Sequence, residues 1–143
     1  MSKLFRTTLW ILSGIGLIAF LVQTLSTFLI SPLMGLLSLL IAAVLVALVI
    51  YLLQRSPMWA RPARLWALLA FLWGSGVAVA LALISSGPVM QLAIGTGWVD
   101  AMMSWSGAYP EEISKATGVI FVLMSFRQLN RPWHGWIVGA VVG

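Results

Sequence analysis

Three ionisable side chains, Glu111, Glu112 and Lys115, lie within five positions and precede an uncharged run over residues 116–125. The only other acidic residue is Asp100. On a helix, residues three and four positions apart share a face, so the Lys115 ammonium can reach either carboxylate. A charge at mid-membrane costs roughly 2.5 to 3.5 kcal/mol unless it is paired or used. The chemistry open to such acids is water activation or metal binding. The alternative is a set of surface charges with Lys115 extending outward.

The composition indicates a membrane protein. Of 143 residues, 62% are hydrophobic and 8% are charged, and the mean hydropathy is +1.07. The hydrophobic share exceeds that of a typical soluble domain, and the charged share is well below it. The eight basic residues give a net charge of +5 but are scattered between apolar stretches, so we expect no nucleic-acid partner. The absence of cysteine excludes disulfides and thiolate metal sites.

The apolar stretches predict an all-α, polytopic transmembrane helical bundle with about four spans plus the start of a fifth. We expect a single transmembrane domain over residues 1–143, with spans near Leu9–Ile30, Pro32–Leu53, Leu65–Ser85 and Glu112–Phe126. The fourth span is short, so its helix is expected to begin below the outer surface. That start places Glu111 and Glu112 inside the membrane region at a helix N-terminus, where the helix dipole stabilises negative charge. Residues 135–143 are too few to cross a bilayer.

Two connections are predicted in more detail. Ser31 is suited to cap the second helix and Pro32 to open it, so the first two helices should form a tight hairpin. The segment Pro88–Trp105 is expected to be interfacial or re-entrant, with breaks at Gly95 and Gly97.

The basic residues predict the orientation of the chain. With the four spans as drawn, seven of them fall on one side of the membrane: Lys3, Arg6, Arg55, Arg61, Arg64, Arg127 and Arg131. Positive charge marks the cytoplasmic side, so the N-terminus should be cytoplasmic and Asp100, Glu111 and Glu112 should lie toward the opposite side. Six tryptophans flank the expected spans and are predicted to anchor them at the lipid surface: Trp10, Trp59, Trp66, Trp105, Trp133 and Trp136.

The motif Glu-Glu-x-x-Lys on a membrane helix, followed by a charged turn and a glycine-spaced helix, resembles the first signature of the PrsW family of intramembrane proteases. The resemblance covers Pro110–Lys115, Gly118–Ser125 and the glycines at 135, 139 and 143. It implies a multi-pass protein of the bacterial inner membrane that lies in the lipid bilayer. It also implies metal-dependent cleavage of a membrane-anchored protein substrate in regulated proteolysis, typically of an anti-sigma factor.

By the same resemblance, Glu111 and Glu112 are the water-activating or metal-site acids, and Lys115 is their orienting partner. The implied cofactor is a divalent metal such as zinc. The later motifs of the family do not follow, and His134, the only histidine, is expected in a cytoplasmic turn away from the acids. We therefore expect the N-terminal part of a longer membrane domain, incomplete and inactive as given, whose metal site is completed by residues absent from this chain.

The sequence is also compatible with two other functions. In the first, the chain is a structural or accessory subunit without catalytic activity, and its helices pack against neighbouring membrane subunits. The Glu111–Lys115 group would then be a polar lock between helices. The second is a transporter that relays protons through an intramembrane acid, and it ranks lower because no inverted repeat is visible.

Overall fold

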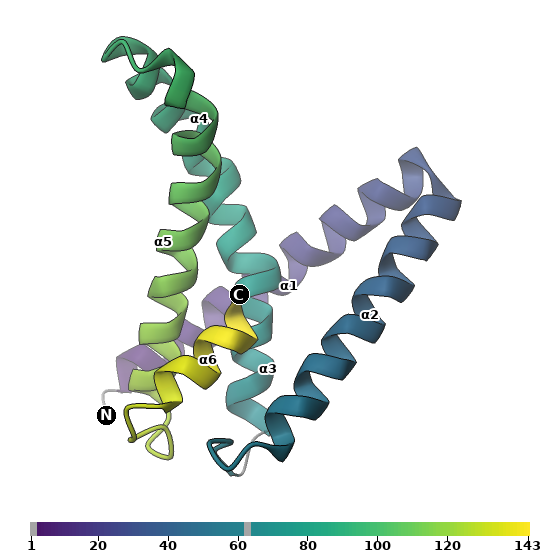
Figure 1. Cartoon of the computed structure of the whole chain (residues 1–143), viewed down its shortest axis with the longest axis vertical. Helices are drawn as coiled ribbons and strands as arrows, with labels where there is room; N and C mark the ends of the chain where they lie inside the picture. Colours follow the sequence, from purple (N-terminus) through teal and green to yellow (C-terminus); the bar gives the residue numbers. More distant parts are fainter. Residues whose placement is uncertain (1–2, 62–63) are drawn as a thin grey trace.

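The computed structural model describes residues 3–61 and 64–143, and every element in this part of the chain is helical (Figure 1). The elements are α1 (Lys3–Ile30), α2 (Pro32–Arg55), α3 (Arg64–Leu72), the π-helical turn η1 (Trp73–Ala78), α4 (Val79–Gly95), the 3₁₀ turn η2 (Val99–Ala101), α5 (Met102–Ser125) and α6 (His134–Val142). The prediction of an all-α membrane bundle is confirmed.

Three of the described helical segments are long and apolar enough to cross a membrane. They are α1, α2 and the continuous run Leu65–Gly95, which joins α3, η1 and α4. Helix α5 has 24 residues and packs along α4, but it carries Glu111, Glu112 and Lys115. Helix α6 has only nine residues. A fourth crossing by α5 therefore stays a prediction.

The third helix extends further than the sequence predicted. We expected it to end near Ser85, but it continues through Pro88 to Gly95. A proline is tolerated inside a long apolar helix, and here α4 packs along α5 over its length. Residues 88–95 are thus continuous with the third helix, and the interfacial or re-entrant position of Pro88–Trp105 stays a prediction. The predicted break is confirmed, since α4 ends at Gly95 and Gly97 has a φ of +80°, which favours glycine.

The start of the next helix was also predicted wrongly. Helix α5 begins at Met102, ten residues before Glu112, because the turn η2 leads the chain directly into a helix that packs along α4. Pro110 consequently lies inside α5. Glu111 is nine residues from the helix start, about 13 Å along the axis. The dipole of the helix N-terminus does not act at this distance, because its effect is confined to the first turn.

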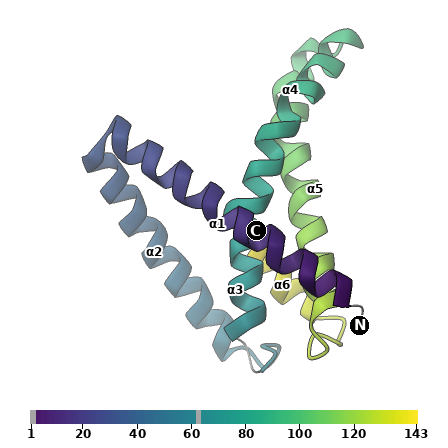
Figure 2. The ribbon, with the colours of Figure 1, turned by 180° about the vertical axis from the view of Figure 1, so that it is seen from behind.

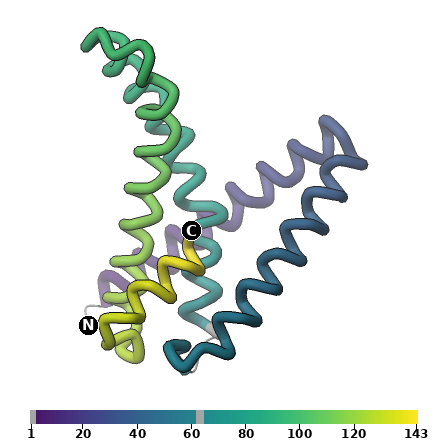
Figure 3. Tube along the Cα trace, viewed as in Figure 1, coloured from purple at the N-terminus to yellow at the C-terminus, as the bar shows by residue number. Residues whose placement is uncertain are grey.

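The α1–α2 hairpin is confirmed, but it is open. Ser31 is the only residue between the helices and Pro32 begins α2, although the Ser31 side chain makes no capping hydrogen bond. The helices touch near the turn, where Gly35 packs against Phe28. Away from the turn, α2 diverges from α1 and stands apart from α6 (Figure 3). Gly35 is the one buried residue of α2.

The core forms around the middle of the third helix. Its large, fully buried side chains are Trp66, Leu69 and Trp73 from that helix, Leu9 from α1, Val122 from α5 and Val138 from α6. Helix α1 crosses the back of this core before it leaves toward α2 (Figure 2). Two backbone contacts leave no room for a Cβ atom, between Gly76 and Gly16 and between Gly74 and Val142. The π-helical turn therefore packs directly against α1 and α6.

The segments that carry the basic residues lie at one end of the molecule. The N-terminal end of α1, the α2–α3 connection and the α5–α6 connection are at the bottom of Figure 1, and η2 with Asp100 is at the top. Glu111 and Glu112 lie between these ends, and the Arg64 side chain is outside the described part of the chain. Trp59 and Trp66 are not lipid anchors, because their rings pack against each other in the core at a centroid distance of 4.7 Å, with 8% and 0% exposure.

Candidate functional site

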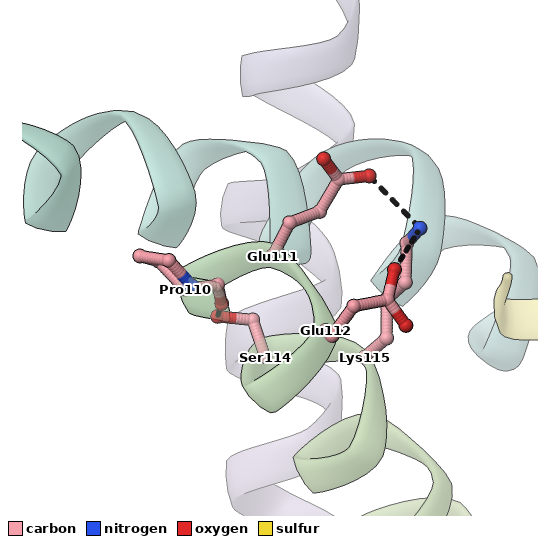
Figure 4. A network of polar contacts seen from close by, with 5 residues as sticks. All are labelled: Pro110, Glu111, Glu112, Ser114 and Lys115. Carbon is pink, nitrogen blue, oxygen red and sulfur yellow. Dashed lines mark hydrogen bonds and ion pairs between the residues drawn. The ribbon is translucent and has the colours of Figure 1, made fainter. Parts of the chain in front are cut away.

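The structure brings Glu111, Glu112 and Lys115 together, as their spacing predicts. The Lys115 ammonium lies 2.8 Å from Oε1 of Glu111 and 3.1 Å from Oε1 of Glu112 (Figure 4). All three side chains project from the middle of α5. One cation faces two carboxylates, so the ionised group keeps one negative charge in excess. Such a group attracts cations more strongly than a balanced ion pair does.

The two carboxylates have different surroundings. Glu111 is 44% exposed and lines a cavity together with Lys115, whose side chain is 21% exposed. Glu112 is 68% exposed and is not among the described residues that line this cavity. The residues are neighbours in sequence and therefore point about 100° apart on the helix. Of the two acids, only Glu111 combines the ion pair with a place in the cavity wall.

The cavity beside Glu111 has a volume of about 360 Å³ and is formed by four segments of the chain. Its remaining lining residues are Leu45, Val46, Val49 and Ile50 of α2, Phe71 of α3, Gly74 and Ser75 of η1, and residues 140–143 at the end of α6. Most of this surface is apolar. The acid pair is thus the charged end of a largely apolar space.

A second cavity adjoins the first along α2. It has a volume of about 500 Å³ and shares Val46, Phe71 and Ser75 with the first. Three polar residues of α1 also line it: Gln23, Thr24 and Thr27. We call the two cavities together the α2 groove. The groove runs between the α1–α2 hairpin and the third helix and ends at Glu111 and Lys115.

A buried tryptophan that the sequence analysis did not single out holds α5 from the other side. The Trp73 indole N–H donates to the Ser114 carbonyl at 2.9 Å, one residue before Lys115. The ring stacks on Phe121 at a centroid distance of 5.3 Å and lies against Gly118. The only sequence signal for this contact is an indole directly before the Gly-Ser-Gly stretch at 74–76.

His134 lies away from the acids, as expected. It is buried as the first residue of α6, and its Nδ1 accepts a hydrogen bond from the Arg131 backbone N–H at 3.1 Å. The opposite end of α6 reaches Lys115, since a Cβ at Gly143 would lie 4.0 Å from Cδ of Lys115. Of the other glycines with this four-residue spacing, Gly139 has no atom within 4 Å of such a position. The glycine-spaced face therefore does not supply the tight contact of α6, which is made by Val142.

The sequence from residue 62 to residue 143 matches the family described as PrsW family intramembrane metalloprotease. This region is more than half of the chain. The chain belongs to the PrsW family. The match includes the acid pair and the helices α3 to α6, whereas α1 and α2 precede it. Comparisons with curated proteins and with solved structures gave no match.

The family is one of metalloproteases, so we tested whether the described residues fit a metal. A catalytic zinc site usually has three protein ligands. Glu111 and Glu112 supply two carboxylates, and the described residues contain no group of three or more His, Cys, Asp or Glu that could hold a metal ion. These side chains do not fit a complete zinc site, and no step below is routed through a metal.

Proposed function

We propose that this PrsW family member cleaves a membrane-anchored protein substrate and that Glu111 is its water-activating base. The observation that carries the proposal is the position of Glu111 at the charged end of the α2 groove, paired with Lys115. A carboxylate in an enclosed space can hold a water molecule beside a bound peptide and remove its proton. The membership in a protease family supports this use of the acid.

The proposed reaction is hydrolysis of a peptide bond. Glu111 takes a proton from water while the water oxygen forms a bond to the peptide carbonyl carbon. The carbon–nitrogen bond then breaks, and the proton passes from Glu111 to the leaving nitrogen, which leaves a new carboxyl and a new amino terminus. Lys115 orients Glu111, and Glu112 is the second acid of the site. A divalent metal such as zinc stays a prediction, with Glu111 and Glu112 as its two candidate ligands in this chain.

The α2 groove is the proposed path of the substrate to the acids. A membrane-anchored polypeptide approaches within the bilayer, where an exposed backbone must find hydrogen-bond partners. The groove offers apolar walls from α2 and the third helix, and polar side chains at Gln23, Thr24 and Ser75. An unwound segment therefore meets both apolar surface and polar partners before it reaches Glu111.

The first test compares the polypeptide termini in membranes of cells that make the full-length protein or its Glu111→Gln, Glu112→Gln double variant. Glutamine keeps the size and polarity of each side chain but removes the base. We expect new termini inside or beside transmembrane segments in the wild-type membranes alone, with equal amounts of both proteins in the membrane. The segment that is cut most strongly then becomes the reporter for purified protein. Identical polypeptide termini in both membranes would contradict the catalytic role of the two acids. They would favour the alternative in which the chain is an accessory subunit and the Glu111–Lys115 group holds helices together.

The proposed location is the bacterial inner membrane, with a cytoplasmic N-terminus. The chain has no cysteine, so single introduced cysteines can be labelled without background. Ser56→Cys lies after α2, and Thr96→Cys lies at the end of α4. In intact spheroplasts, a membrane-impermeant maleimide should label Thr96→Cys and spare Ser56→Cys. Labelling of Ser56→Cys alone would mean that the N-terminus faces the outside. Labelling of both cysteines would contradict the prediction that these residues lie on opposite sides of the membrane.

A further inference from the structure

We propose that Trp73 is a positioning residue for the acid pair, which deepens the proposed function and rests on it. The Trp73 side chain is 1% exposed, and its N–H donates to the backbone of α5 at Ser114. Ser114 lies three residues after Glu111 and directly before Lys115. A bond at this point fixes how far α5 is rotated about its axis. The rotation in turn decides whether Glu111 faces the cavity.

The contacts around Trp73 hold the rotation of α5 from several sides. Below the hydrogen bond, the ring stacks on Phe121, and Phe121 in turn packs against Phe5 of α1 at a centroid distance of 5.4 Å. Beside the ring, Gly118 leaves space that a Cβ atom would fill. The ring therefore touches α5 at three successive turns, at residues 114, 118 and 121. A helix held at three turns can neither roll nor slide without breaking one of these contacts.

The π-helical turn that begins at Trp73 explains how one short segment contacts three helices and also lines the cavity. A π turn inserts an extra residue and changes the direction of each side chain that follows it. Here Trp73 faces α5, Gly74 meets α6, Ser75 lines the cavity and Gly76 meets α1. Such turns are frequent at functional sites. The cavity wall and the support of α5 are thus set by the same turn.

The test uses Trp73→Phe, with Trp66→Phe as its matched control. Phenylalanine keeps an aromatic ring and removes the N–H donor. Trp66 is also fully buried on α3, and its N–H donates to the Ala60 carbonyl at 3.1 Å, away from α5. The two variants thus each lose one buried indole hydrogen bond. Only Trp73→Phe loses a bond to the helix that carries the acids.

A second pair of variants tests the contact between Trp73 and α5 by changing residues of α5. Gly118→Ala adds a methyl group where the Trp73 ring lies, whereas Gly107→Ala adds one on the same helix with no heavy atom within 4 Å. Both replacements favour the helical backbone by a similar amount, since alanine has the higher helix propensity. A difference between them therefore reports the contact with Trp73.

Two readouts on full-length protein in proteoliposomes decide the outcome. The first is cleavage of the reporter segment. We expect Trp73→Phe and Gly118→Ala to lower kcat by about tenfold, as for one lost buried hydrogen bond, with KM nearly unchanged and a shifted pH profile. The second needs no substrate: a water-soluble carbodiimide with glycine ethyl ester labels the carboxylates, and mass spectrometry gives the ratio of labelled Glu111 to labelled Glu112. We expect this ratio to change at least about twofold, since the labelling depends on which way each acid faces.

The controls should leave kcat, the pH profile and the labelling ratio as in the wild type. The inference is overturned if Trp66→Phe and Gly107→Ala cause the same changes, or if Trp73→Phe and Gly118→Ala leave the labelling ratio unchanged. Because labelling does not depend on proteolysis, a protein that cuts no reporter would contradict the proposed function while the ratio still tests the role of Trp73.

Discussion

Helix α2 and the α3–α6 region are built differently, although both are apolar and helical. Helix α1 joins them, since Leu9 and Gly16 pack into the core and its other end leads to α2. In the α3–α6 region, large side chains are fully buried and glycines bring backbones into contact. In α2, one residue of 24 is buried. The family match includes the packed region and excludes the hairpin. The packed region holds the acids in place, and the open side of the hairpin leaves a groove that leads to them.

This difference follows from the nature of the solvent. Lipid tails are as apolar as leucine, so exposed apolar side chains of α2 cost nothing in a bilayer, and helix association depends on close packing and polar contacts instead. Gly16, Gly74 and Gly76 supply that packing around η1. Helix α2 has a comparable contact only at Gly35. We therefore expect α2 to move more easily than the region that carries Glu111.

The largest expected effect comes from closing the groove. Val46→Cys on α2 and Ser75→Cys on η1 place two cysteines that line both cavities. Joining them with a short, reducible bifunctional thiol reagent should reduce reporter cleavage to background, because the substrate can no longer reach Glu111. Reduction should restore the rate. Trp98→Cys with Trp105→Cys is the control, since the rings of these residues lie 4.9 Å apart at the α4–α5 turn and neither residue lines the groove. Full activity of the cross-linked Val46–Ser75 protein would contradict the groove as the path.

The next effect concerns the packed region and is measured by unfolding in detergent. A Cβ on Gly16 would lie 2.6 Å from Cγ2 of Val77, whereas one on Gly14 meets no heavy atom within 4 Å. Gly16→Ala should therefore lower the free energy of unfolding by about 1 to 3 kcal/mol through overpacking. Gly14→Ala, on the same helix, should be neutral or raise it by up to about 1 kcal/mol. Equal stabilities would mean that α1 does not pack on η1 as described.

A smaller effect is expected from the cation. Lys115→Met removes the ammonium that holds Glu111 but leaves the carboxylate in the cavity. Reporter cleavage should fall by about tenfold, equivalent to roughly 1.4 kcal/mol in the barrier. Lys3→Met, at the start of α1, should leave the rate unchanged. A loss of reporter cleavage as large as that in Glu111→Gln would contradict this role and would mean that Lys115 takes part in the reaction directly.

The sequence predicts local features of this protein well. The ion pairs depend only on spacings of three and four residues, and the first two helices follow from long apolar stretches bounded by Ser31 and Pro32. The helix bounds are predicted less well. The segment expected to begin at Pro88 continues the third helix, and the helix expected near Glu112 begins at Met102 with Pro110 inside it. Tertiary contacts between α4 and α5 stabilise these helices in spite of the prolines.

The support of the site could not be predicted in the same way. Trp73 and Ser114 are 41 positions apart, and their contact depends on a π-helical turn that no apolar periodicity indicates. The buried contact of Trp59 with Trp66 likewise depends on where the α2–α3 connection folds back onto the core. Their position at the ends of apolar stretches suggested lipid anchors instead.

The most direct test compares Glu111→Gln with Glu112→Gln in the reporter assay, because the acids are adjacent but only Glu111 lines the cavity. Our account predicts that Glu111→Gln lowers kcat by at least about 100-fold, the usual contribution of a general base. Glu112→Gln should lower it by about tenfold or less. Wild-type turnover by Glu111→Gln, or a greater loss in Glu112→Gln, would contradict the assignment of Glu111 as the base.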